Sequence, residues 1–548
     1  MATTREREGV SGGGSPWRVP ALVLVLAVVV PLLNVVPTLE GAWREPPPES
    51  EYLGFRWLIG DHLQYGAFAR QGEAGRLLME NLFTTEAQRP SYILLYFNVV
   101  GLTMRFSGLA FPVAWEVLRV ASGFGLLVAA WYFVCLCFGD RRRQMQAWMM
   151  VAFSGGLYWM ASLLPAGALS RPGYPFLTDP AHFQWNWSTF GSMLMALWIA
   201  PVMLCLVAGV LLLSQRFSGA GRWAGTFALG PLIWFVHPHT GNVAYFAFGL
   251  FGLSPALHAL WNLEAVPWKR TARSFLDVLP FILSFAVVVG YLTWASTDAV
   301  FAAGGKGAAE WNPAYSVFWY PLVYGLLLPF GLLGIRWSAS MPEGPRRFVL
   351  AWLAAAFILS VNPLFSGVKY QFLIHLPLAI MASHGIDEMR ERSAWLRRAS
   401  KGFTGLAVGA LLFVHGPVSI LRDMSEPVQE MRAYAPRPRV EAGRWLDGQP
   451  DGTILCGYQA CGDLAYLTGK KVYTGHWLLT LDQPQKHREL AAFFRAGIPA
   501  NLKLDFLRHH GIRYVYYGLQ EREMGSVDPA LLLQTVYDRD GVTIYKVP

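Results

Sequence analysis

The sequence is poor in charge: only 15% of its 548 residues are Asp, Glu, Lys or Arg, whereas 54% are hydrophobic. Soluble domains carry roughly 25% charged residues. A soluble protein with this little charge could not cover its surface, so that class is excluded. The aromatic content of 14% suits a protein that needs aromatic side chains at two membrane interfaces.

Cysteine is scarce, with five residues and no Cys/His set at a convincing zinc spacing. Cys135, Cys137 and Cys205 lie in apolar runs and are expected to be packing residues. Cys456 and Cys461 fit either a disulfide in an oxidising compartment or two independent residues at a strand-to-helix turn.

Repeats at a solenoid period and a signal-peptide cleavage site are also missing. Long apolar runs are plentiful instead. A membrane-crossing helix needs about 20 mostly apolar residues, and about eleven stretches have this length. They lie near residues 19–38, 114–138, 146–165, 190–214, 222–237, 242–263, 275–296, 316–336, 347–363, 370–387 and 402–421. We therefore expect an α-helical polytopic membrane domain over residues 1–421.

Basic residues gather in alternate loops, as at Arg141–Arg143 and Arg390–Arg398, whereas the short opposite loops hold only Arg171, Lys306 and Lys369. The positive-inside rule then places the N-terminus in the cytoplasm. The net charge of +9 belongs to these inner loops, and no nucleic-acid partner is expected. Keeping this orientation requires Tyr92–Met104 to be an interfacial helix within a long outer loop, residues 39–113.

After residue 422 the pattern changes to short β-like runs separated by helical stretches, which predicts a small outer α/β domain over residues 422–548. The expected strands are Thr453–Tyr458, Lys471–Thr474, Arg513–Tyr517 and Val542–Val547, with a hairpin at Asp540-Gly541. The expected location is a bacterial inner membrane, with this domain in the periplasm.

Charged and polar residues at the outer ends of the spans are the candidate site residues. Asp61, followed by His62 and Tyr65, could supply a general base or simply cap a helix. Lys369 and Tyr370 could grip a lipid phosphate or serve as an ordinary interfacial anchor.

Other outer positions offer weaker candidates. Glu116 and Arg119 could form an ion pair on one helix face. His237 and His239 could ligate a metal, but a polar lining is the simpler interpretation. Further outer-loop residues that are expected to be solvated charges are Asp179, His182, Lys306 and Glu310.

Taken together, these features resemble the GT-C superfamily of membrane glycosyltransferases, in particular the branch of protein mannosyltransferases and lipid A aminoarabinose transferases. The residues that carry the resemblance are Asp61 in the first outer loop, Arg89-Pro90-Ser91-Tyr92, Glu116-Val-Leu-Arg119-Val and Lys369-Tyr370 with Pro377. The family's lysine motif has a longer spacing and a second proline, so the match at Lys369 is altered. The Trp-Trp-Asp-Tyr-Gly signature of oligosaccharyltransferases is missing, which argues against peptide N-glycosylation.

The resemblance implies that a sugar moves from a polyprenyl-phosphate donor to a periplasmic acceptor, which is a glycan, a lipid or a protein. Asp61 would be the base of an inverting reaction, and Lys369, with Arg119, would stabilise the leaving phosphate. The other residues expected to bind the substrate or the lipid phosphate are Tyr370, His62, Tyr65, His237 and His239. Some relatives use a divalent metal and others none; Asp61, Asp179 and His237 would be the ligands if one binds. His476 and Trp477, with Tyr473, Gly475 and Thr480, would face the cleft from the C-terminal domain.

Two other functions remain open at this point. A transporter is disfavoured because no half-to-half symmetry is visible and the charges cluster at span ends instead of mid-span. A non-catalytic scaffold with a recruitment domain is the third possibility.

Overall fold

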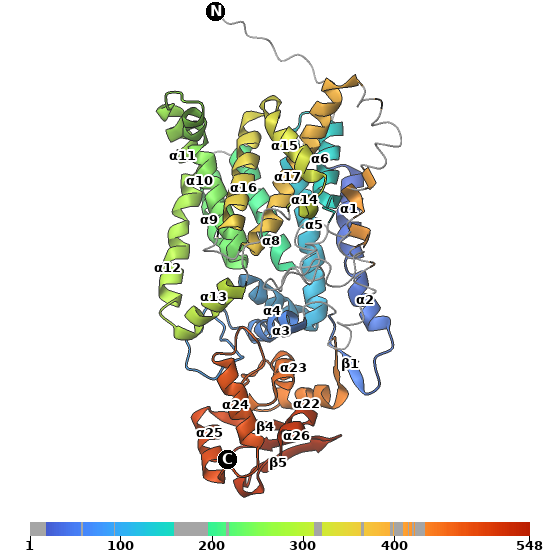
Figure 1. Ribbon diagram of the computed structural model, residues 1–548, viewed down its shortest axis with the longest axis vertical. Coiled ribbons are helices and arrows are strands. Elements are labelled where there is room, and N and C mark those ends of the chain that lie inside the picture. The colour runs from blue at the N-terminus through green and yellow to red at the C-terminus, as the bar shows by residue number, and fades with distance from the viewer. Residues whose placement is uncertain are drawn as a thin grey trace, which may run out of the picture.

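The computed structural model describes residues 18–55, 59–92, 94–157, 196–214, 219–311, 320–362, 367–394 and 433–548, with scattered positions between 398 and 421. Helices form one end of the molecule and a small sheet with further helices forms the other (Figure 1). The bundle helices, in chain order, are α1 (Ala21–Leu33), α2 (Val36–Trp43), α5 (Phe111–Cys137), α6 (Arg141–Phe153), α8 (Ala196–Leu213), α9 (Gly219–Val236), α10 (Pro238–Trp261), α11 (Trp268–Leu283), α12 (Phe285–Ala295), α13 (Ala299–Trp311), α14 (Tyr320–Tyr324), α15 (Leu327–Arg336), η6 (Ser338–Ser340), α16 (Glu343–Val361) and α17 (Val368–Arg392).

Five helical stretches in the described part are long and apolar enough to cross a membrane: Ala21–Trp43, Phe111–Cys137, Pro238–Trp261, Trp268–Ala295 and Glu343–Val361. Leu197–Leu213 and Leu327–Arg336 are shorter apolar helices. Many of their large apolar side chains are exposed, as expected for surfaces that face lipid. The chain is thus built as a helical membrane protein.

Two expected spans differ in the structure. The run 316–336 is broken into α14 and α15 at Gly325, whose φ of 50° lies in the left-handed region that interrupts a helix. Helix α6 ends at Phe153, so the rest of the expected span 146–165 is not helical up to residue 157 and lies outside the described residues beyond it. Most of the expected span 402–421 also lies outside them.

The loop between α2 and α5 carries a short strand and two helices: β1 (Ser50–Tyr52), α3 (Ile59–Glu73) and α4 (Leu95–Ser107). Helix α4 corresponds to the expected interfacial helix Tyr92–Met104 and begins a few residues later. Both helices lie between the bundle and the C-terminal elements (Figure 1). This loop therefore joins the two parts of the molecule.

The C-terminal residues contain the strands β2 (Tyr434–Pro436), β3 (Thr453–Leu455), β4 (Ile512–Tyr517), β5 (Gln534–Arg539) and β6 (Val542–Lys546). Four of them form a sheet in the order β3-β4-β6-β5, with β3 parallel to β4 and the other pairs antiparallel. The hairpin β5–β6 turns at Asp540 and Gly541, both with positive φ. The accompanying helices are α22 (Arg437–Asp447), α23 (Tyr458–Thr468), α24 (Gln483–Phe494), α25 (Ala500–His509), α26 (Leu519–Met524) and η7 (Pro529–Leu531).

The expected strand Lys471–Thr474 is wrong. Only Val472 pairs with the sheet, through an isolated bridge to Ile454. The bridge has two hydrogen bonds, from the Ile454 N–H to the Lys471 carbonyl at 2.9 Å and from the Tyr473 N–H to the Ile454 carbonyl at 3.0 Å. The backbone N–H of Val472 donates to the carbonyl of Leu82 at 2.8 Å. Gly475, with a φ of 139°, turns the chain away directly afterwards.

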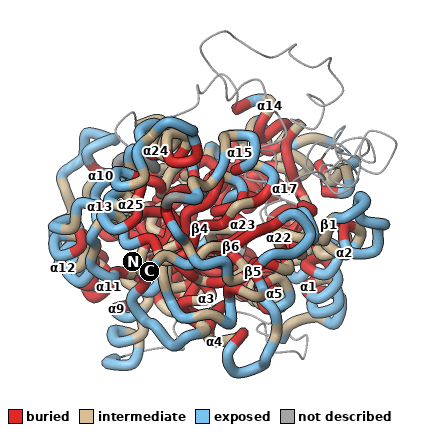
Figure 2. Tube along the Cα trace, turned by 90° about the horizontal axis from the view of Figure 1, so that it is seen from below, coloured by how far each residue is buried: buried red, intermediate tan, exposed pale blue. Residues whose placement is uncertain are grey.

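The first outer loop and the C-terminal elements pack closely. Strand β1 pairs with β2, with Tyr52 opposite Tyr434. Helix α23 lies on α3, where the Tyr466 hydroxyl donates to the carbonyl of Leu53 at 3.1 Å. Seen from the C-terminal end, much of β4, β6 and α23 is buried, whereas α12, α13 and α25 carry much exposed chain (Figure 2).

Cys456 and Cys461 form a disulfide with their Cα atoms 5.3 Å apart. Both residues are fully buried, at the connection from β3 into α23. The other three cysteines are free. Of the two arrangements compatible with the sequence, the structure therefore has the disulfide.

Candidate functional site

Asp61 stands in the first turn of α3 and is half-buried. One turn later, the Tyr65 hydroxyl donates to Asp61 Oδ2 across 3.5 Å, which is a long hydrogen bond. Burial and the negative charge of Asp61 raise the pKa of Tyr65 well above its usual value. Tyr65 therefore stays a neutral donor toward the carboxylate at all physiological pH values.

An aromatic wall fixes the orientation of this turn of α3. Trp115 of α5 stacks on Tyr65, with ring centroids 5.4 Å apart, and meets His62 edge-on at 5.4 Å. The other side of His62 stacks on Phe55 at 5.2 Å. His62 is buried among these rings, so its evident role is packing.

Lys369 lies in the first turn of α17, and its Nζ is 5.4 Å from the centroid of the Trp198 ring of α8. Asp61 is close enough to Lys369 for the two charges to interact electrostatically. The structure thus brings together a carboxylate and an ammonium group from two helices far apart in the sequence. Trp198 was not predicted, because nothing distinguishes it from other aromatic residues in an apolar run.

A polar cluster adjoins Lys369. His237 and His239 both lie within electrostatic reach of it, and their rings are 5.2 Å apart. His239 meets the ring of Tyr370 edge-on at 5.4 Å. The Tyr370 hydroxyl accepts a hydrogen bond from Asn242 Nδ2 at 3.1 Å. Four of the sequence-predicted residues are thereby gathered around the start of α17.

His237 also acts within its own helix. It is the N-cap residue of α10, and its Nδ1 lies 2.9 Å from the Thr240 hydroxyl. One nitrogen is therefore engaged in capping. His239 Nδ1 is buried and has no hydrogen-bond partner among the described residues, which makes it the better available polar group of the two.

Arg119 has a carboxylate partner on its own helix. Its Nε donates to Glu116 Oε2 at 2.9 Å, and the side chain of Arg119 is only 2% exposed. The second oxygen of Glu116 accepts from the Thr38 hydroxyl at 3.3 Å. The ion pair expected for this motif is present, and it links α2 to α5.

The C-terminal candidates fall into two environments. His476 is buried against Phe83 at 5.5 Å and under Trp477 at 5.8 Å, and Trp477 is 38% exposed. Burial lowers the pKa of His476 to about 4. Tyr473, expected to face a cleft, instead lies fully buried against Phe506 in the core of the C-terminal elements.

The remaining candidates are two residues expected to face the cleft, Gly475 and Thr480, and four residues of the expected outer loops. Gly475 packs against Gly462 and Cys461, and the Thr480 hydroxyl accepts from the backbone of His476 at 3.2 Å. Asp179 and His182, together with the side chains of Lys306 and Glu310, lie outside the described residues. Within the described ranges, no three His, Cys, Asp or Glu side chains are grouped to hold a metal ion.

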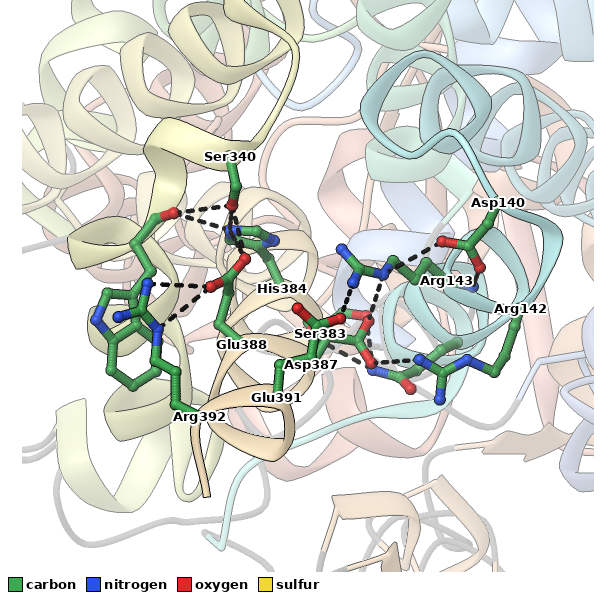
Figure 3. A network of polar contacts seen from close by, with 12 residues as sticks. Asp140, Arg142, Arg143, Ser340, Ser383, His384, Asp387, Glu388, Glu391 and Arg392 are labelled. Atoms are coloured by element: carbon green, nitrogen blue, oxygen red, sulfur yellow. Dashed lines mark hydrogen bonds and ion pairs between the residues drawn. The ribbon is translucent and has the colours of Figure 1, made fainter. Parts of the chain in front are cut away.

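A second polar network lies at the other end of α17 (Figure 3). Asp387 is buried and pairs with Arg142 at 3.3 Å, and Glu388 accepts from Ser340 at 2.7 Å. At about 1.5 Å of rise per residue, Asp387 is about 27 Å along the helix from Lys369. Arg142 belongs to a loop predicted to be cytoplasmic, so this network is separate from the cluster around Asp61.

Comparisons with known proteins give only structural matches; no family model and no curated sequence matches the chain. The oligosaccharyltransferase AglB from Archaeoglobus fulgidus, in complex with an inhibitory peptide and a dolichol-phosphate, aligns with a TM-score of 0.49 and 11% identity over 96% of this chain and 74% of its own. ArnT from Cupriavidus metallidurans bound to undecaprenyl phosphate aligns with a TM-score of 0.49 and 12% identity over 96% and 97% of the two chains. At these scores and identities the matches carry no functional assignment, which depends on the site residues themselves.

Proposed function

We propose that the protein is a membrane glycosyltransferase that moves a sugar from a polyprenyl-phosphate donor to an acceptor hydroxyl at the outer membrane face. The observation that carries this proposal is the electrostatic interaction between Asp61, in the first turn of α3, and Lys369, in the first turn of α17. One group can accept a proton and the other can hold a phosphate, and transfer from a sugar phosphate needs both.

The chemistry follows from the charges of the two groups. Asp61 accepts the acceptor's hydroxyl proton while the oxygen attacks the anomeric carbon and inverts its configuration. The bond to the phosphate breaks, and the phosphate leaves with the electron pair. Because this leaving group is a stable anion, no general acid is required, and Lys369 stabilises the growing negative charge.

The place of Lys369 supports a lipid-borne phosphate. It lies in the first turn of a long helix of the bundle, above an indole ring, where a lipid headgroup would lie. A sugar attached to such a headgroup would reach α3, which crosses the end of the bundle.

The buried disulfide in the C-terminal part supports an oxidising compartment on that side, such as a bacterial periplasm. The basic network at the other end supports a cytoplasmic location there. The acceptor would then be a periplasmic glycan, lipid or protein. A divalent metal is not needed for any step of this proposal.

The test is transfer of labelled sugar by the purified protein in liposomes that contain polyprenyl-phosphate-linked sugars. Asp61→Asn is expected to lower the rate about 100- to 10,000-fold, because the base is lost while the shape is kept. Asp505→Asn, at an exposed position of α25, is the matched control and should transfer at the wild-type rate. Full activity of Asp61→Asn would refute the assignment of the base.

A second variant tests the other group. Lys369→Met should raise the concentration of lipid donor needed for half-maximal rate, and Lys369→Arg should restore part of the affinity, because a guanidinium also binds phosphate. Unchanged donor dependence in Lys369→Met would show that the phosphate is held elsewhere.

A further inference from the structure

The loop that joins α3 to α4 forms a closed strap, defined here as residues 79–92. An antiparallel bridge closes its neck, with Met79 and Ser91 exchanging backbone hydrogen bonds of 2.8 and 2.9 Å. The Gln71 side chain of α3 holds the backbone of Glu80 by two further bonds of 2.9 Å. The strap therefore has a fixed shape and can transmit a displacement from one end to the other.

One end of the strap is bound to the C-terminal elements through Lys486 of α24. The Lys486 ammonium pairs with Glu86 Oε1 at 2.8 Å and donates to the Thr84 hydroxyl at 3.0 Å. The Lys486 side chain is 3% exposed and is therefore shielded from water, whereas the Glu86 side chain is 35% exposed. Removing Glu86 would leave the buried ammonium of Lys486 without its carboxylate, which is strongly unfavourable.

The other end of the strap is bound to the membrane bundle. The backbone N–H of Arg89 donates to the Asp298 carboxylate, at the start of α13, across 2.7 Å. The guanidinium of Arg89 lies 4.8 Å from the ring centroid of Trp294 in α12. Tyr92, the last residue of the strap, packs on Phe235 of α9, with ring centroids 5.8 Å apart. The strap thus contacts both α9 and the α12–α13 connection.

From Phe235 the contacts continue to the start of α17. Phe235 meets Trp234 edge-on at 5.4 Å, and the Trp234 indole N–H donates to Asn242 Oδ1 at 3.2 Å. Asn242 in turn donates to the Tyr370 hydroxyl at 3.1 Å, next to Lys369. Each contact in this series involves a ring or an oriented hydrogen bond, so a shift of the strap would change the position of Tyr370.

We propose that Lys486 is a positioning residue for the lipid-phosphate end of the site: by holding the strap against the C-terminal elements it sets the Trp234–Asn242–Tyr370 series and therefore the placement of Lys369. This inference rests on the proposed function for its kinetic consequence. Its structural part, the coupling between Lys486 and Tyr370, does not depend on any activity.

The experiment compares Lys486→Met, Glu86→Gln and the double variant in the full-length protein in nanodiscs. The matched control is Lys503→Met, because Lys503 is another buried lysine of the C-terminal part, bonded to the Arg495 carbonyl at 2.9 Å and not to the strap. Amide hydrogen exchange of residues 79–92 and of residues 234–242 and 370–374 is measured first, since exchange reports local opening without requiring transfer.

Each single variant is expected to raise exchange about tenfold in both the strap and the two bundle segments, and Lys503→Met in neither. Because Lys486 and Glu86 act as one unit, the double variant should be no worse than the worse single variant. Lys486→Arg should return exchange to near the wild-type level. Increased exchange confined to the strap, or spread evenly over the protein as in a global destabilisation, would overturn the proposal.

The kinetic measurement separates this inference from the proposed function. In Lys486→Met the donor concentration for half-maximal transfer should rise about three- to tenfold, with a smaller change in kcat. The wild-type protein could transfer no sugar while the Lys486 and Glu86 variants still raise exchange in both the strap and the two bundle segments. That result would contradict the proposed function and support the positioning role. A normal donor dependence together with uncoupled exchange would exclude that role.

Discussion

The ammonium group of Lys369 lies over the indole ring of Trp198, with Nζ 5.4 Å from the ring centroid. Phe372 stacks on the same indole at 5.3 Å, so the ring is held from α17 as well. The indole therefore orients the ammonium group of Lys369.

Replacing Trp198 by Leu should weaken the binding of a polyprenyl phosphate about 5- to 30-fold, because a shielded cation–π contact contributes about 1–2 kcal/mol to holding the cation. Trp198→Phe keeps an aromatic face and should lose less. The measurement is the Kd for a polyprenyl phosphate in nanodiscs. Equal affinity in wild type and Trp198→Leu would show that the ring does not position Lys369.

The hydrogen bond between Tyr65 and Asp61 predicts a pH effect. A donor stabilises the ionised carboxylate, so Tyr65→Phe should move the acid limb of the transfer profile to higher pH, by a small amount because the bond is long. The alkaline limb should not move, since the pKa of Tyr65 is already raised far above the working range. An acid limb that coincides with the wild type would show that this hydroxyl does not influence the base.

Buried His476 predicts a loss of stability in mild acid. Its pKa is lowered to about 4 by burial, whereas an unfolded histidine titrates near about 6.5. The unfolded state therefore takes up the proton first, and stability falls as pH decreases from about 6.5 toward 4, by up to about 3 kcal/mol.

The variant for this test is His476→Asn, which keeps an acceptor for the backbone N–H groups of Leu478 and Leu479 and cannot titrate. Thermal unfolding at pH 7 and pH 5 should show a smaller acid-induced loss in the variant than in the wild type. An identical loss in both proteins would assign the acid sensitivity to other groups.

Two glycines of α3 provide a matched pair. A Cβ added at Gly66 would lie 2.3 Å from the Tyr466 ring of α23, whereas one at Gly60 would meet nothing within 4 Å. Gly66→Ala should therefore destabilise the protein by about 1–3 kcal/mol. Gly60→Ala should be neutral or stabilising by up to about 1 kcal/mol, because alanine favours helix. The measurement is the thermal unfolding temperature of both variants. A Gly66→Ala variant as stable as the wild type would mean that α23 can move away from α3.

The sequence was informative where one physical cause dominates. Runs of about 20 apolar residues locate helices such as α5, α10 and α16, because the membrane demands that length. Asp61 and Lys369 were found because charge is rare beside such runs. The sequence predicted only that the two residues share one membrane face, and the structure adds that Asp61 lies within electrostatic reach of Lys369.

Other features depend on distant partners and left no local signal. Trp198 resembles any aromatic residue in an apolar helix until Lys369 is placed above it. The run Lys471–Thr474 has the composition of a strand, but it pairs with β3 only at Ile454 before the chain turns away at Gly475. The strap required knowledge that Glu86 and Lys486 meet, although hundreds of residues separate them.

The pairing of β1 with β2 constrains how the protein is made. Tyr52 leaves the ribosome long before Tyr434, its partner in the pair. At about 5–20 residues per second, the intervening chain takes about 20–80 seconds to synthesise. During this time the helices enter the membrane, while residues 39–113 still lack two of their partners, strand β2 and Lys486 of α24. The contacts that join residues 39–113 to the C-terminal elements therefore form only after Tyr434 and Lys486 have been synthesised.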